Sequence, residues 1–353
     1  ERGYHTAAIG KWHIHSWPHE VGFDHYVIPR VHHCHTGQSF TEDGGPEFTP
    51  PGYSVDYESE RVEAFLKDRG TSTAPFFLYY NISVPHCPLD DAPEKYLSMY
   101  RPEDVPLRAN VDPEREIENQ DRAFKVYRHD FKHYQLHLPY TETLPEGYSL
   151  RHVIAAYYGM TTWMDSALGR MLTALERHGL SENTLVVFAS DHGDNLGSHG
   201  LVQKGGPNEE SIRIPLIVAG PGTIPEVNAS HVASLVDVAP TTLGLAGIEA
   251  PDHVHGRNLA ALCRGEDGSR QRSEAFVETH RGVALRTLTH SYYVPFSESA
   301  RHALAERPEQ FFDLGNDPCQ LRNLCKQTDL PEPAGRLDAA LRRWDSEIPW
   351  MTG

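Results

Sequence analysis

The chain has 353 residues. Single hydrophobic cores tend to divide beyond roughly 250 to 300 residues, so we expect one large domain and a smaller one. The net charge of -17 argues against a general nucleic-acid binder, whose footprint is a basic patch. The sequence has no apolar run of about 18 residues or more, so it predicts no membrane span. Its 5 cysteines lack Cys-x-x-Cys spacing, which excludes a disulfide-dense small scaffold.

The first predicted strand runs from Gly3 to Gly10 and leads into two basic residues, Lys11 and His13. If the chain stays extended past the strand, both side chains point to the same side, because strand side chains alternate between two faces. Apolar residues at helical spacing then predict a helix over 55–67.

An aromatic-rich strand is predicted over 76–83, and a proline-rich loop follows it. Pro85 and Pro88 end the strand and stiffen the loop that presents His86. The polar segment 101–147, which is rich in proline, predicts a long excursion with only local helix.

The longest predicted helix covers 150–175, and Gly179 caps its C-terminal end. Asp165 lies near the apolar stripe of this helix, and we expect it to be buried and bonded to nearby backbone rather than catalytic. The helix feeds a β-branched strand over 184–190, which we expect to be fully buried in a parallel or mixed sheet.

Another buried strand is predicted over 212–218 and another helix over 235–245. After about Leu262 the pattern changes to short strands and a terminal helix, which indicates a small α+β appendage. We therefore divide the chain into a main domain over 1–262 and a subdomain over 263–353. The elements expected in the subdomain are strands over 275–278, 283–286, 292–295 and 310–314 and a helix over 335–344.

Asp191 and His192 directly follow the strand that ends at Ser190. In open α/β sheets ligands bind just beyond the carboxyl ends of strands. A carboxylate oxygen and an imidazole nitrogen are donors that a hard or borderline divalent cation accepts. The structural alternative is that Asp191 caps a turn and His192 is an ordinary surface histidine.

Four further side chains would fit chemistry at the same sheet edge: Lys11, His13, His86 and Lys204. A cation can neutralise an oxyanion ester, lysines can bind its oxygens, and imidazoles can transfer protons. These residue types together predict an enzyme that acts on such an ester.

Several segments resemble motifs of the sulfatase family in the alkaline phosphatase superfamily. The run from Gly3 to His13 resembles the family's second signature, in which Gly-Tyr-x-Thr leads into Gly-Lys-Trp-His. The run Ser190-Asp191-His192-Gly193-Asp194 through Lys204-Gly205 resembles its metal and lysine segment. Several motifs in the same order are more specific than any one of them. Further matches lie at 209–216, 220–222, 163–169, 237–241 and 311–318.

The resemblance implies a fold and a set of roles. The fold would be an alkaline-phosphatase-like α/β mixed central sheet flanked by helices, with a small C-terminal α+β subdomain. By resemblance, Asp191 and His192 bind one Ca²⁺ or Mg²⁺, and Lys11 and His13 contact the nucleophile. His86 and Lys204 would contact the sulfate, and one of them would protonate the leaving oxygen. The chain departs from the family after His13, where Ile14-His15 replaces the usual Leu-Gly.

The family's nucleophile is a formylglycine made from Cys or Ser in a Cys/Ser-x-Pro-Ser-Arg motif, preceded by two aspartates of the metal site. None of the cysteines at 34, 87, 263, 319 and 325 lies in such a motif. We therefore expect the natural protein to carry a segment ahead of Glu1 that supplies the formylglycine and the remaining ligands.

The resemblance implies a sulfuric ester hydrolase that acts on a sulfated small molecule or glycan. Specificity is expected in the loops over 17–52 and 101–147. One alternative is a phosphatase or phosphodiesterase of the same superfamily, although two lysines fit a one-metal sulfate site better than a two-zinc site. The other is a non-catalytic fragment or pseudoenzyme that binds an anion. The sequence predicts neither compartment nor oligomeric state.

Overall fold

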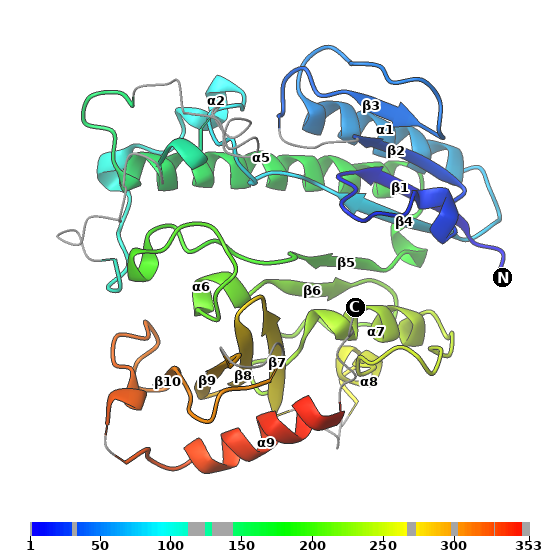
Figure 1. Cartoon of the computed structure of the whole chain (residues 1–353). Helices are drawn as coiled ribbons and strands as arrows, with labels where there is room; N and C mark the ends of the chain where they lie inside the picture. The colour runs from blue at the N-terminus through cyan, green and yellow to red at the C-terminus, as the bar shows by residue number, and fades with distance from the viewer. Residues whose placement is uncertain are drawn as a thin grey trace. The chain divides into compact units, whose positions relative to one another are not determined.

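The computed structural model describes residues 2–29, 34–111, 124–128, 144–266, 273–297, 303–327 and 329–347 (Figure 1). The chain divides into two compact units. The first contains residues 1–107 and 114–182, and the second contains residues 108–113 and 183–353. Most of the predicted excursion over 101–147 lies outside the described residues.

The first unit is built on a four-stranded sheet in the order β3-β2-β1-β4. β1 (His5–Gly10) pairs in parallel with β2 (His25–Pro29) and with β4 (Phe76–Asn81), and β3 (Phe40–Glu42) runs antiparallel to β2. The register sets Gly10 opposite Asn81, so the carboxyl ends of β1 and β4 lie side by side. Both predicted strands and the mixed character of the sheet are confirmed.

Two long helices accompany this sheet. α1 (Ser54–Arg69) packs against α5 (Leu150–Arg177) and also contacts β1. An ion pair joins the two helices, with Arg170 Nε 2.9 Å from Glu63 Oε1. Gly179 follows α5 in the left-handed region with a φ of 69°, as expected for its C-terminal end. The short α2 (Glu94–Leu97) also packs against α5.

The expected burial of Asp165 is wrong, because its side chain is exposed. The buried side of α5 carries Met160, Trp163 and Ala167, which follow one another at intervals of three and four residues. A residue two positions from Trp163 lies on the opposite side of a helix.

In the second unit, β5 (Val186–Ala189) pairs antiparallel with β6 (Leu216–Ala219). All four β5 residues are partly exposed, so the expected full burial of this strand is wrong. Among the described residues β6 is the strand that pairs with β5, and a single neighbour does not cover a strand completely.

The strand predicted over 212–218 is correct only in its second half. A short helix, α6 (Glu209–Ile212), occupies the region where that strand was expected to begin. Pro215 disfavours helical backbone at the residue before it, so the helix stops and the chain extends into β6. The predicted helix over 235–245 is confirmed as the 3₁₀ turn η5 (Leu235–Asp237) followed by α7 (Val238–Leu245), and α8 (Ala260–Cys263) comes later.

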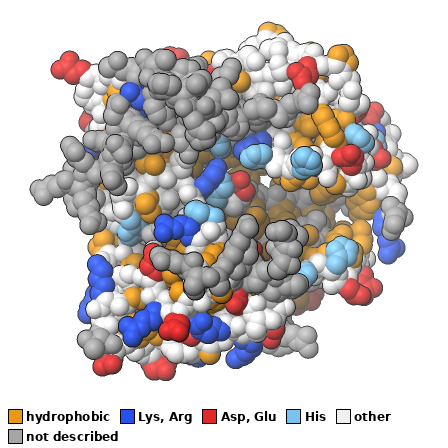
Figure 2. Space-filling model, in the orientation of Figure 1, with side chains coloured by type: hydrophobic (Ala, Val, Ile, Leu, Met, Phe, Trp, Pro, Cys, Tyr) orange, Lys and Arg blue, Asp and Glu red, His pale blue; other side chains and the backbone are white. Residues whose placement is uncertain are grey.

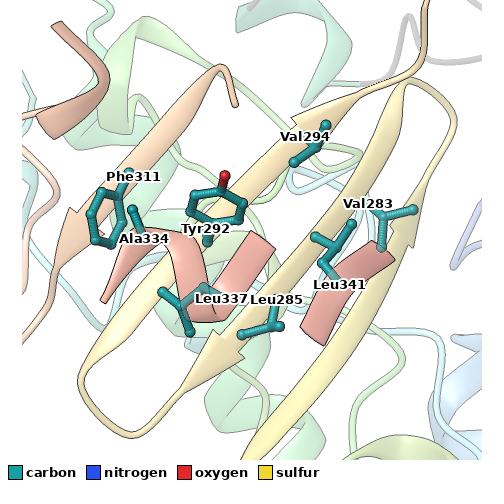
Figure 3. Packing of buried hydrophobic residues seen from close by; sticks show 8 residues of the cluster. All are labelled: Val283, Leu285, Tyr292, Val294, Phe311, Ala334, Leu337 and Leu341. Atoms are coloured by element: carbon teal, nitrogen blue, oxygen red, sulfur yellow. The ribbon is translucent and has the colours of Figure 1, made fainter. Parts of the chain in front are cut away.

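The C-terminal part forms an antiparallel sheet in the order β10-β9-β8-β7, covered by α9 (Ala334–Glu347). Its strands are β7 (Glu274–Thr279), β8 (Gly282–Thr287), β9 (His290–Pro295) and β10 (Gln310–Asp313). Alternate strand residues face helix residues spaced by three and four, as these two periodicities require (Figure 3). The buried cluster contains Val283, Leu285, Tyr292, Val294, Phe311, Ala334, Leu337 and Leu341.

No helix in the described part of the chain has the length and apolar character needed to cross a membrane. Cys319 and Cys325, both in the described part of the chain, do not form a disulfide.

Candidate active site

Lys11 directly follows β1, and its backbone is fixed to the end of β4. The Lys11 amide donates to Asn81 O at 2.9 Å, and the Asn81 side-chain amide donates back to Lys11 O at 2.8 Å. This reciprocal pair fixes the backbone from which the lysine side chain leaves the sheet.

β1 ends at Gly10, the residue at which the sequence predicted the strand to end, and residues 11–13 do not continue it as a strand. Gly10 has a φ of 93°, and a Cβ at this position would lie 2.3 Å from Asn81 O. The turn therefore requires glycine for its backbone conformation and for its close approach to β4. Beyond it, the Trp12 indole donates to Ser16 O at 2.7 Å and its ring packs edge-on against Phe23, while His13 is exposed.

His86 lies in the loop after β4, as the sequence predicted. Its side chain is half-buried. Its Nδ1 is 2.7 Å from Cys87 O, and its amide donates to Ser83 O at 3.0 Å. A carbonyl oxygen can only accept, so Nδ1 carries the hydrogen and the ring orientation is set by the backbone. Nε2 is then the nitrogen that would exchange a proton with a substrate.

Asp191 and His192 follow β5 and lie against each other. The Asp191 carboxylate is 3.4 Å from His192 Nε2, and it accepts from the His192 amide at 3.0 Å. The other ring nitrogen, Nδ1, is 2.8 Å from Gly193 O and must be its donor. Metal-binding histidines commonly hold one ring nitrogen in this way and present the other to the ion. The donor set therefore fits one divalent cation shared by Asp191 and His192.

Two ligands are fewer than a hard cation needs. Among the residues that the structure describes, no group of three or more His, Cys, Asp or Glu side chains could hold a metal ion. Within the described residues, Asp191 and His192 alone would therefore leave a cation short of ligands, and their role in metal binding stays a prediction.

Gly193 brings α6 against this pair. Its amide donates to Ser211 O at 2.8 Å, and a Cβ would lie 2.0 Å from Glu210 O. No other residue type fits this approach without moving the backbone, so the glycine fixes the Asp191–His192 pair relative to α6.

The loop that carries Lys204 is closed by backbone and side-chain bonds at its base. The Asn195 amide and side chain both donate to Gln203 O, at 2.8 and 2.7 Å. Lys204 itself is exposed, and Gly205 beside it has a φ of 107°.

A buried polar cluster supports this loop from residues that the sequence did not single out. The Asn110 side-chain amide donates to Glu210 Oε1 at 2.7 Å and to Cys319 O at 3.1 Å, and Arg108 also pairs with Glu210 at 2.7 Å. Burial opposes ionisation of Glu210, but the bonds from Asn110 and Arg108 outweigh it and lower the pKa of this carboxyl. His199, whose amide donates to Asn110 O, has its pKa lowered by burial.

The structure thus places the predicted residues in two groups. Lys11, His13 and His86 follow β1 and β4 in the first unit, and Asp191, His192 and Lys204 follow β5 in the second. Sequence reasoning missed Asn81, although a polar residue closing an aromatic strand is a visible signal. It also missed the supporting cluster around Asn110, whose partners are about a hundred or more positions away in sequence.

Family models match nearly the whole chain. The model described as Sulfatase matches residues 1–248, and that described as N-sulphoglucosamine sulphohydrolase, C-terminal, matches residues 197–347.

Some of the curated relatives that match the chain are named sulfatases. The chain is 28% identical to an ulvan-active sulfatase from Formosa agariphila, over 98% of this chain and 64% of that protein. It is 28% identical to an arylsulfatase from Clostridium perfringens, over 94% of this chain and 73% of the relative. A multifunctional alkaline phosphatase superfamily protein from Trinickia caryophylli is 33% identical over 75% of this chain and 54% of its own length.

Solved structures share the fold. A protein in complex with its substrate D-glucosamine-2-N,6-O-disulfate aligns with a TM-score of 0.75 at 23% identity, covering 98% of this chain and 80% of its own. A 2-O GAG sulfatase aligns with a TM-score of 0.68 at 21% identity, covering 98% of this chain and 72% of its own. The alkaline-phosphatase-like fold with its C-terminal subdomain is therefore confirmed. Its signature segments, its matched family models and this fold together establish that the chain belongs to the sulfatase family.

Proposed function

We propose that this protein hydrolyses organic sulfate monoesters and that its substrates are sulfated glycans. The observation that carries the proposal is the Asp191–His192 pair, with His192 Nδ1 held by Gly193 O so that Nε2 is presented beside a carboxylate. The substrate class is supported by the relatives, which include the ulvan-active sulfatase and an N-acetylglucosamine-6-O-sulfatase.

Sulfatases generally use a divalent metal and a formylglycine. In our proposal the ion is Ca²⁺ or Mg²⁺, held in part by Asp191 and His192, and it would neutralise sulfate oxygens while formylglycine supplies the nucleophile.

The remaining roles fall to side chains of this chain. Lys204 binds oxygens of the sulfate group through its ammonium group, and Lys11 contacts the nucleophile. His86, oriented by Cys87 O, protonates the leaving alcohol through Nε2, and His13 serves as a base near the nucleophile. We also propose that the chain divides into a catalytic domain over 1–262 and a smaller subdomain over 263–353.

The direct test is Lys204→Ala in the protein expressed from its complete gene. Loss of a cation that stabilises the transition state should lower kcat by about 10²-fold or more. Lys326→Ala, which removes the same charge from an exposed position in the 3₁₀ turn η6 (Leu324–Lys326), is the matched control and should keep the wild-type rate. Unchanged hydrolysis by the Lys204 variant would contradict the assignment. Parallel assays with phosphate monoesters and diesters would show whether phosphate chemistry is preferred instead.

A further inference from the structure

The turn between β7 and β8 presents two basic side chains at its tip. His280 and Arg281 are both exposed there. The Thr279 hydroxyl donates to Gly282 O at 3.0 Å and accepts from the Arg281 amide at 3.2 Å. These bonds close the turn, so its two basic residues are held on an ordered hairpin.

The tip lies beside the loop of Lys204. A Cβ at Gly205 would be 3.4 Å from His280 Cε1 and 3.6 Å from Nδ1, so the imidazole packs directly against the residue that follows Lys204. Residues 75 positions apart in the chain are therefore neighbours.

A second contact fixes the hairpin relative to this loop. Arg286, near the end of β8, forms a bidentate pair with Glu209 at the start of α6, with distances of 2.6 and 3.0 Å. The Glu209 amide also donates to the side-chain oxygen of the buried Gln320 at 3.0 Å. Bidentate arginine–carboxylate pairs constrain orientation as well as distance. The hairpin tip and the Lys204 loop are thus joined on both sides.

The two cationic side chains, Lys204 and Arg281, and the His280 imidazole have no ion-pair partner among the residues that the structure describes. Lys204, His280 and Arg281 stand in none of its salt bridges. This matters in a chain of net charge -17, in which acidic and basic side chains are interspersed on the face shown in Figure 2. A local group of unpaired cations attracts an anion.

We propose that His280 and Arg281 bind a second anionic group of the substrate, next to the sulfate that Lys204 contacts. The inference rests on the proposed function and narrows its substrate class to sulfated glycans with another sulfate or a carboxylate close to the scissile ester. Arg281 would bind this group bidentately, and His280 would donate a hydrogen bond to it.

The test uses Arg281→Ala and His280→Ala, with Arg336→Ala on the exposed face of α9 as a control of equal charge. Three ligands are compared by titration calorimetry and by kcat/KM: N-acetylglucosamine 6-sulfate, glucosamine-2-N,6-O-disulfate, and a monosulfated disaccharide that carries a uronate. The two doubly charged ligands differ in the second group, and each response shows whether sulfate or carboxylate is bound.

Arg281→Ala should weaken a doubly charged ligand by about tenfold, the loss of one charge-assisted bond, and should leave the monosulfated sugar within about twofold. His280→Ala should act in the same direction, and Arg281→Lys should recover part of the loss. Equal losses for all three ligands, no loss, or the same loss in Arg336→Ala would overturn the inference. If wild type hydrolyses none of the esters but the selective binding loss appears, the proposed reaction fails and the anion site stands.

Discussion

The chemistry at single residues depends on which ring nitrogen of each histidine is held by the backbone. His86 and His192 both direct Nδ1 to a carbonyl oxygen of the following residue, at 2.7 and 2.8 Å. The carbonyl cannot donate, so each ring presents Nε2. In the proposed mechanism this one local geometry would serve proton transfer at His86 and metal binding at His192.

His192→Ala should lower the affinity for Ca²⁺ by at least about tenfold, because a ligand and its oriented nitrogen are lost together. Calorimetric titration of the metal-free protein measures this directly. His231→Ala, which removes a partly exposed histidine from the second unit, is the control. Equal Ca²⁺ affinity in wild type and His192→Ala would argue against a metal at this position.

The buried Glu58 contributes to the pH dependence of the free energy of unfolding. Its side chain in α1 is completely buried, and burial raises its pKa well above the usual value of 4.5. The native protein therefore keeps a proton that the unfolded chain releases, so this group's contribution to stability is full below pH 4.5 and is lost as the pH rises.

Glu58→Gln cannot ionise and should remove this pH dependence. We expect the variant to be more stable than wild type at pH 7, with the difference disappearing below pH 4.5. Urea unfolding at both pH values gives the measurement. Parallel stability curves for the two proteins would show that Glu58 has an ordinary pKa.

At the scale of elements, two glycines in α5 have opposite surroundings. A Cβ at Gly159 would lie 2.2 Å from Tyr96 O of α2, whereas nothing lies within 4 Å of one at Gly169. Gly159 allows α2 and α5 to approach closely. Gly169 has room for a side chain, so glycine is not required there.

Gly159→Ala should therefore lower the free energy of unfolding by about 1–3 kcal/mol through overpacking. Gly169→Ala should raise it by about 0.5–1 kcal/mol, the usual difference in helix preference. Urea denaturation measures the free energy of unfolding of the two variants, which carry the same substitution at two positions of one helix. A gain in both variants would mean that α2 yields easily to the added methyl group.

Elements set by local patterns were predictable, and those set by distant contacts were not. α1 and α5 follow their apolar spacing, and β1 and β4 follow their apolar runs. The end of β1 at Gly10 was predicted, but the close approach of Gly10 to Asn81, some 70 residues away, was not. The same limit applies to the site: Asp191 and His192 stand next to each other, but the contact of His280 with the Lys204 loop has no local signature.

At the scale of the whole molecule, an ion pair joins two distant segments of the second unit and is expected to stabilise its fold. Glu209 and Arg286 are separated by 77 residues, and their side chains are only 10% and 22% exposed. Removing one partner of a buried pair leaves the other charge uncompensated.

Arg286→Ala should lower the free energy of unfolding by about 3 kcal/mol. Arg286→Lys should lower it less, because the charge remains but the bidentate geometry does not. Arg336→Ala, on the surface of α9, should stay within about 0.5 kcal/mol of wild type. Thermal and urea unfolding report these differences, and a loss below 1 kcal/mol in Arg286→Ala would show that the pair is dispensable.

The Glu209–Arg286 pair also bears on how such proteins can be recombined. It joins residues on opposite sides of the predicted boundary at 262, as does the contact of Gly205 with His280. A chimera that exchanged residues 263–353 between relatives would separate both partnerships, even though the exchanged piece has its own sheet and helix. A successful graft would have to transfer the loop over 204–209 together with the C-terminal piece, so both segments should come from the same parent protein.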